Sequence, residues 1–255
     1  MKAAKIEVMT KKLVDSLLEM NTSNRPVKPS VVARYQRDIE AGNWRLTNQG
    51  IGVTNDGVLT DGQHRLLALQ KAGYPPVECV VVYGLDMEAQ RVVDQHVKRS
   101  ARDIFRLSFN STVSRLTPAV IQVLAKFEDE FTIEGKRTAL TIDEIFDRFE
   151  ILSDSIESVC SVVVKESYFP APIVAGCVYF HHKALASTEQ IAEFLNQVRL
   201  GENLNRKMPA FHMRNYLAAS RKSGAGSTVQ NERYIKTKKA LEAFVSGKEM
   251  GVLRV

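Results

Sequence analysis

The chain has 255 residues, of which 44% are hydrophobic and 25% charged, and its formal net charge is +6. This length allows one large or two modest domains, and the composition is ordinary for a soluble globular protein. Residues 1–20 lack a continuous hydrophobic run, so the sequence does not predict a signal peptide. The most apolar stretch, residues 173–180, is too short to span a bilayer. We therefore expect a cytoplasmic protein without membrane association.

The three cysteines do not form a recognisable pattern. Cys79, Cys160 and Cys177 are widely spaced and have apolar neighbours. Such thiols are typical of buried cysteines in a reducing compartment, not of disulfides or metal ligands. The sequence predicts no protein metal site.

The first part of the chain alternates short strands and helices. The predicted elements are a helix over residues 31–41, strands over 51–54 and 58–60 around a turn at Asn55-Asp56-Gly57, a helix from about Asp61 to Ala72, and a strand over 77–82. Gly73 follows the second helix, where a C-terminal cap belongs. The single tryptophan, Trp44, is expected to anchor the core.

The run Asp61-Gly62-Gln63-His64-Arg65 stands where the second short strand gives way to a helix. The start of a helix favours an anion, because its first N–H groups lack intrahelical partners. Arg65 has a planar fork of donors suited to phosphate, His64 offers a further hydrogen bond, and Gly62 allows close backbone approach.

The roles of these polar side chains stay open at this stage. Asp61 is able to cap the helix, hold a magnesium ion or accept a proton from a hydroxyl group. For His64 and Arg65, the structural alternative is a satisfied histidine and a surface salt bridge.

The pattern D-G-x-H-R-x-x-A after a strand pair resembles the signature of the ParB/sulfiredoxin superfamily, in particular its DGQHR-motif branch of phage and bacterial proteins. The likeness covers approximately residues 24–105, including Asn24-Arg25-Pro26 and a second segment from Asp94 to Asp103. It implies a ParB/sulfiredoxin-like nucleotide-binding domain. It also implies that Gly62, Gln63, His64 and Arg65 contact a nucleoside triphosphate with Mg²⁺, and that Arg99 completes the pocket, with further contacts from Asp94 and Lys98.

The sequence departs from two branches of this superfamily. Gln63 stands where sulfiredoxins have their reactive cysteine, and the Glu-Asn pair of partition proteins is replaced by Asp94-Gln95. Two classes of function therefore remain. One is a phosphotransferase or NTPase in phage or plasmid DNA metabolism, with Asp61 and His64 as catalytic residues. The other is a ParB-like DNA-binding module without catalytic activity.

Helical periodicity dominates after about residue 106. The predicted helices cover residues 118–127, one that begins at a Thr141–Glu144 capping box, then 172–185, 188–200, 209–221 and 230–246. The apolar side chains of the capped helix, Ile145, Phe146, Phe149 and Ile151, are expected to form its buried stripe. The sequence thus predicts an α+β fold, with a nucleotide-binding domain over residues 1–106 and an all-helical domain over residues 107–255.

Positive charge gathers at the end of the chain. Residues 201–255 contain 11 basic and 4 acidic side chains, an excess of seven, which is compatible with a nucleic-acid interface or with a solvated helical surface. The candidate DNA contacts are Arg102, Arg106, Arg206, Lys207, Arg214, Arg221 and Lys222. A homo-oligomer is compatible with the sequence.

Overall fold

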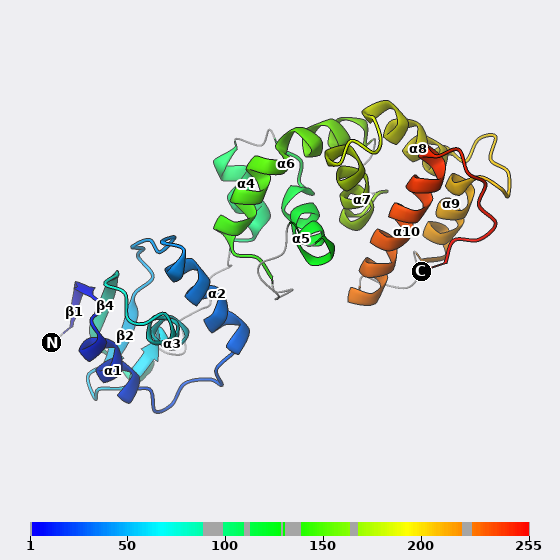
Figure 1. Ribbon diagram of the computed structural model, residues 1–255. Helices are drawn as coiled ribbons and strands as arrows, with labels where there is room; N and C mark the ends of the chain where they lie inside the picture. The colour runs from blue at the N-terminus through cyan, green and yellow to red at the C-terminus, as the bar shows by residue number, and fades with distance from the viewer. Residues whose placement is uncertain are drawn as a thin grey trace. The chain divides into compact units, whose positions relative to one another are not determined.

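The computed structural model describes residues 2–88, 99–109, 113–128, 130, 139–163, 168–220 and 226–254. The chain divides into two compact units, Met1–Lys98 and Arg99–Val255 (Figure 1). The boundary lies earlier than the predicted one after residue 106. The reason is helix α4 (Ala101–Ser108), whose Phe105 is only 3% exposed and packs with Phe146 in the core of the second unit.

The first unit is built on a four-stranded mixed sheet. Its strands are β1 (Ala3–Val8), β2 (Ile51–Thr54), β3 (Leu59–Asp61) and β4 (Glu78–Leu85), in the spatial order β1-β4-β2-β3. Strands β2 and β4 are parallel, whereas the other neighbours are antiparallel. The predicted strand pair around Gly57 is confirmed, and Gly57 has the positive φ, 73°, that a tight turn of this kind needs.

Three helices share a core with this sheet: α1 (Lys11–Glu19), α2 (Pro29–Glu40) and α3 (Gln63–Lys71). The mixed α+β fold is therefore confirmed. Gly73, with a φ of 79°, follows the end of α3 as predicted. Trp44 packs against this core, and its Nε1 donates to the carbonyl of Glu78 at 2.9 Å.

Strand β1 and helix α1 were not predicted. Strand β1 lies at one end of the sheet, and most of its residues are exposed, so it lacks the alternation of buried and exposed residues that a half-buried strand shows. Helix α1 buries only Val14 and Leu17.

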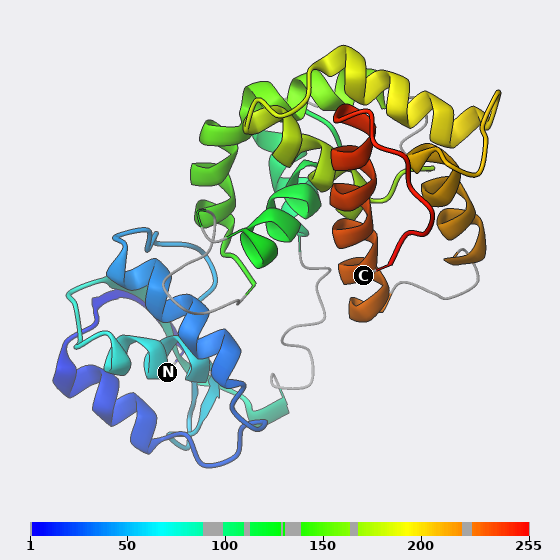
Figure 2. The ribbon, with the colours of Figure 1, turned by 45° about the vertical axis from the view of Figure 1, so that its right-hand side comes forward.

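The second unit contains helices and no strand within the part of the chain that the structure describes. After α4 come α5 (Thr117–Phe127), α6 (Ile142–Val162), α7 (Ala171–His182), α8 (Thr188–Leu200), α9 (Pro209–Ser220) and α10 (Ser227–Val245). Helix α7 packs against α5, α6 and α10 (Figure 2). None of the described helices is long and apolar enough to cross a membrane.

The capping box at the start of α6 is confirmed, because Thr141 and Glu144 each accept a hydrogen bond from the other's backbone N–H. The predicted stripe was partly wrong. Ile145 and Phe149 are buried, but Ile151 is 62% exposed. In an α-helix, residues 145, 149 and 152 recur on one face, and Leu152 takes the buried position instead.

The thiols give a testable prediction. Burial raises the pKa of Cys79 to about 11 and that of Cys177 to about 12, whereas Cys160 is partly exposed. Since the thiolate is the reactive form, we expect Cys160 to react first with a disulfide reagent at about pH 8, and Cys79 and Cys177 to react only after unfolding. Titration of thiols with and without urea measures this, and rapid labelling of all three in the native protein would contradict it.

The same shifts predict a dependence of stability on pH. Both folded-state pKa values lie above the ordinary value of 9.0, so the buried thiols contribute their full stabilisation below that pH. This contribution is lost as the pH rises toward the folded-state values.

Candidate functional site

The motif predicted from the sequence lies at the junction of β3 and α3. Asp61 ends the strand, and Gly62 is the N-cap of the helix with a φ of 106°. A Cβ atom at Gly62 would lie 2.9 Å from Cγ1 of Ile51, so both the backbone conformation and the available space favour glycine. Asp61 is therefore not the N-cap, which was one of its expected roles. Gly62 has no side chain with which to cap α3.

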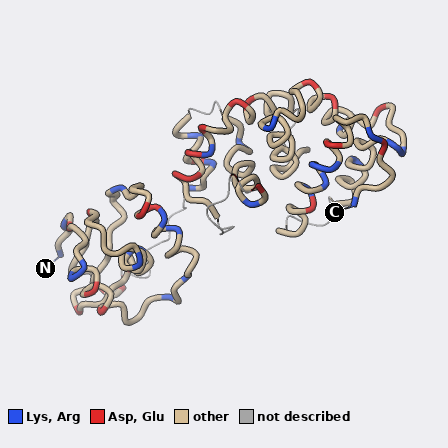
Figure 3. Tube along the Cα trace, viewed as in Figure 1, with Lys and Arg blue, Asp and Glu red and all other residues tan. Residues whose placement is uncertain are grey.

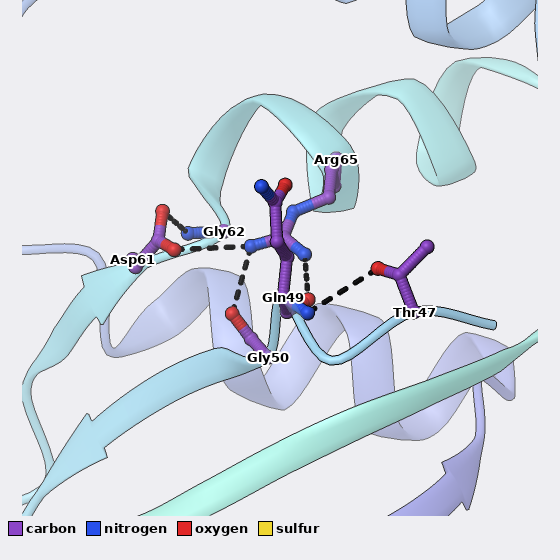
Figure 4. Close-up of polar contacts among 6 residues, drawn as sticks. All are labelled: Thr47, Gln49, Gly50, Asp61, Gly62 and Arg65. Carbon is purple, nitrogen blue, oxygen red and sulfur yellow. Dashed lines mark hydrogen bonds and ion pairs between the residues drawn. The ribbon is translucent and has the colours of Figure 1, made fainter. Parts of the chain in front are cut away.

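Arg65 holds three segments of the first unit together (Figure 4). Its guanidinium group donates from Nη1 to the carbonyl oxygen of Gln49, and from Nη2 to the carbonyl of Gly50 at 2.8 Å and to Oδ2 of Asp61 at 3.1 Å. The Arg65 side chain is only 12% exposed. The other oxygen of Asp61, Oδ1, accepts the N–H of Gly62 at 2.6 Å. Arg65 thus connects the start of β2, the end of β3 and the first turn of α3.

Gln63 and His64 attach the segment before α2 to this junction. Gln63 donates from Nε2 to the carbonyl of Arg25 at 2.9 Å, and His64 accepts the N–H of Lys28 on its Nε2 at 3.0 Å. A backbone N–H can only donate, so Nε2 of His64 is the acceptor in this contact. Both side chains are buried. His64 is thus a hydrogen-bonded structural histidine, which was the alternative that the sequence left open.

A pocket of about 350 Å³ opens at this junction. It is lined by residues of the motif, by the segment before α2 and by α2 itself. Its charged and aromatic lining residues are Arg25, Lys28, Arg34, Tyr35, Asp61, His64 and Arg65. Four of these side chains are cationic and one is a carboxylate, which gives an excess of three positive charges when the histidine is neutral. Such a lining favours an anion.

Three cations of this pocket, Arg25, Lys28 and Arg34, were not predicted as site residues from the sequence. Lys28 and Arg34 are exposed, and within the described part of the chain neither forms an ion pair. Val31, Arg34 and Tyr35 all line the pocket, which matches the three- and four-residue spacing of one helix face. That spacing, on a helix the sequence did predict, groups Arg34 with Val31 and Tyr35 on one face, but it does not show that this face lies beside the motif.

The second predicted segment of the pocket stays a prediction. Asp94 and Lys98 lie outside the described residues. Arg99 is exposed and belongs to the second unit.

The predicted nucleic-acid residues have several different environments. Arg214 donates from Nη1 to the carbonyls of Val198 and Arg199, at 2.9 and 2.6 Å, and so satisfies the C-terminal end of α8. Lys207 forms an ion pair with Glu249, and Arg206 is exposed. Arg221 and Lys222 lie outside the described residues.

Lysine and arginine recur along α10 (Figure 3), and one of them has several contacts within the fold. Lys238 donates to Glu128 at 2.7 Å and lies over the ring of Tyr179, and Tyr234 donates its hydroxyl to the same Glu128 carboxylate. Burial raises the pKa of Tyr234 above its ordinary value, with a further contribution from Glu128. The excess of basic residues at the end of the chain is therefore not a continuous free stripe.

Arg102 and Arg106 do come together. They line a second pocket of about 270 Å³, within the second unit, with Arg115 and the apolar side chains of Phe105, Val113 and Pro118. The Ser100 hydroxyl holds the pKa of Asp103 below its ordinary value, and Asp103 does not line the pocket.

Among the residues that the structure describes, no group of three or more His, Cys, Asp or Glu side chains is placed to hold a metal ion. Asp61 is the only carboxylate among the described residues that line the first pocket. A Mg²⁺ ion there would take most of its ligands from phosphate oxygens and water, which is its usual coordination beside a nucleotide.

No protein-family model matches the chain, and no curated protein matches it. The pocket residues and the motif resemblance therefore carry the functional proposal.

The contacts of Arg65 predict a structural effect. In an Arg65→Ala variant, the carbonyls of Gln49 and Gly50 and the Asp61 carboxylate lose their partner, and we expect the first unit to lose about 2–3 kcal/mol of stability. Trp44 is the only tryptophan and packs in this unit, so its fluorescence during urea unfolding reports the change. Arg34→Ala is the matched control and should leave the midpoint nearly unchanged. Equal midpoints for wild type and Arg65→Ala would show that the three contacts contribute little.

Proposed function

We propose that the first unit binds a nucleotide, with its phosphates in the pocket at the start of α3. The observation that carries this proposal is the excess of three positive charges around a pocket of about 350 Å³. The volume lies within the range of small-molecule sites. The resemblance to the DGQHR-motif branch of the ParB/sulfiredoxin superfamily supports the same ligand.

The phosphates are expected to bind Lys28 and Arg34 together with the first turn of α3. Both side chains are exposed in the described structure, so their charges are available to a ligand. A helix start without a side-chain cap favours an anion through its N–H groups and its partial positive charge. Arg65 contributes positive charge to the pocket, but its guanidinium group is already bound to two carbonyls and Asp61.

Tyr35 provides the surface for the base or sugar. Its ring and Val31 line the same pocket as the cations, one turn apart on α2. Aromatic faces stack on any base, so this contact supports nucleotide binding without a choice of base.

The contacts of Asp61 and His64 favour binding over catalysis by these two residues. Both oxygens of Asp61 accept hydrogen bonds, and Nε2 of His64 accepts the N–H of Lys28. A general base needs an acceptor directed at the substrate. We therefore place a nucleotide-binding switch ahead of a phosphotransferase or NTPase.

Calorimetric titration of ATP, CTP and GTP, each with and without Mg²⁺, tests the proposal. We expect one or more nucleotides to bind the wild type, and Lys28→Ala and Arg34→Ala each to weaken binding about tenfold, since one charge-assisted hydrogen bond contributes ~1.5–3 kcal/mol before solvent screening. Lys12→Ala is the matched control, because Lys12 is an exposed cation of the same unit outside the pocket.

Absence of binding in the wild type, or equal weakening by all three variants, would contradict the proposal. Arg65→Ala is a poor test of binding by itself, because it is expected to destabilise the unit. Release of inorganic phosphate in the same mixtures separates an enzyme from a switch.

A second candidate function is DNA binding by the second unit. It is favoured by one observation, the pocket that Arg102, Arg106 and Arg115 line with the ring of Phe105. Arginines bind phosphates through their planar fork, and such contacts are independent of base sequence. This candidate is the ParB-like DNA-binding module that the sequence left open, limited to Arg102 and Arg106 among the predicted DNA contacts.

The salt dependence of DNA affinity tests the second candidate. If Arg102 and Arg106 each bind one phosphate, each Arg→Ala variant should reduce the slope of log affinity against log salt concentration by about 1. Lys239→Ala, an exposed cation of α10 that does not line the pocket, should leave the slope unchanged. A loss of slope only in Lys239→Ala would move the interface to α10, and no binding to the wild type would exclude this function.

A further inference from the structure

The two edges of the sheet in the first unit differ. At the β3 edge, the N–H of Leu59 donates to the carbonyl of Met20 at 2.9 Å, and the carbonyl of Leu59 accepts the side-chain amide of Asn24 at 2.6 Å. The chain itself therefore covers that edge. At the other end of the strand order is β1, which pairs only with β4 in the described sheet.

The register of β1 against β4 shows which of its backbone groups point outward. Met9 donates its N–H to the carbonyl of Val77 at 2.8 Å, in continuation of the pairing that joins Val8 to Glu78. In an antiparallel pair, residues that bond to the partner alternate with residues that do not. Ala3, Lys5 and Glu7 thus bond to β4, which leaves the N–H and C=O groups of Ala4, Ile6 and Val8 on the outer side.

The outward residues are also apolar and exposed. Ile6 is 61% exposed and Val8 is 48% exposed. Their β4 neighbours on the same sheet face include Val80 and Val82, which are only partly buried and do not belong to the core. An edge strand with unpaired backbone groups can pair with a strand of another chain, and most natural proteins prevent such pairing by charged or twisted residues at the edge. On the sheet face that carries Ile6 and Val8, the side chains of β1 are apolar along the edge.

The charges of β1 match a second copy of the same strand. Lys5 and Glu7 flank Ile6, and within the described residues neither forms an ion pair. If two antiparallel copies are centred on Ile6, Lys5 of each lies opposite Glu7 of the other. These positions are the non-hydrogen-bonded pairs, where side chains lie closest.

We propose that two copies of this chain pair through β1 in an antiparallel manner, with Ile6 opposite Ile6 of the second copy. The two Ile6 residues exchange two hydrogen bonds, and each Val8 N–H donates to the carbonyl of Ala4 in the other copy. The carbonyl of Val8 already accepts the N–H of Thr10 at 2.8 Å, so it adds no further bond. The sheets of the two copies then form one continuous sheet related by a two-fold axis.

Sedimentation of the full chain over a range of concentrations, combined with charge exchange, tests the pairing and its register. Wild type should show a reversible monomer–dimer equilibrium. Lys5→Glu or Glu7→Lys places like charges opposite each other at two symmetric positions, and we expect each to raise the dimer dissociation constant about tenfold. The double variant Lys5→Glu/Glu7→Lys restores opposite charges and should return to the wild-type value.

A wild type that stays monomeric at every concentration would overturn the proposal. So would a dimer that the single variants do not weaken, or one that the double variant does not restore.

Cross-linking supplies a second, geometric readout. Cα atoms of a hydrogen-bonded pair lie about 5.5 Å apart, which suits a disulfide. Ile6→Cys should therefore form a disulfide-linked dimer under oxidising conditions. Lys5→Cys is the matched control, since residue 5 lies opposite residue 7 in this register. Equal cross-linking of both variants would contradict the register.

Discussion

The guanidinium group of Arg65 is the constraint on which the first unit depends. One side chain binds the carbonyls of Gln49 and Gly50, at the entry to β2, and the carboxylate of Asp61, at the end of β3. Because Arg65 is itself in the first turn of α3, these contacts attach the start of the helix to both strands. The chain can make this turn only with a glycine between strand and helix, since Gly62 has a positive φ and lies against Ile51.

The remaining residues of the motif build the pocket from this fixed point. Gln63 and His64 hold the backbone of Arg25 and Lys28, and so bring the start of α2 to the start of α3. Lys28, Arg34 and Tyr35 then line the pocket beside the motif. The most distinctive residues of the sequence thus organise the pocket, while less distinctive residues of α2 and of the position before it supply its exposed cationic side chains. This division of roles suits a binding pocket more than a catalytic centre.

In the second unit, the number of basic residues in a segment does not show how many of them are accessible to a partner. The last part of the chain is strongly basic, yet Arg214 binds the end of α8, and Lys238 binds Glu128 beneath α10. These cations stabilise helix packing and are not displayed to a partner. Arg102 and Arg106, one turn apart on α4, instead join Arg115 around a pocket. The contacts of a cation within the fold decide whether it can bind a partner, and the net charge of a segment does not contain this information.

The sequence by itself determined the local elements: the strand pair around Gly57, the capped start of α6 at Thr141, and the strand-to-helix junction at Asp61 and Gly62. Each depends on backbone preferences and contacts within a few residues, which a sequence records directly. Tertiary structure alone decided the edge position of β1, the exposure of Ile151, and the carbonyl partners of Arg65. It also placed Lys28 and Arg34 beside the motif. These properties depend on pairing and packing between segments distant in the chain, and local periodicity does not contain that information.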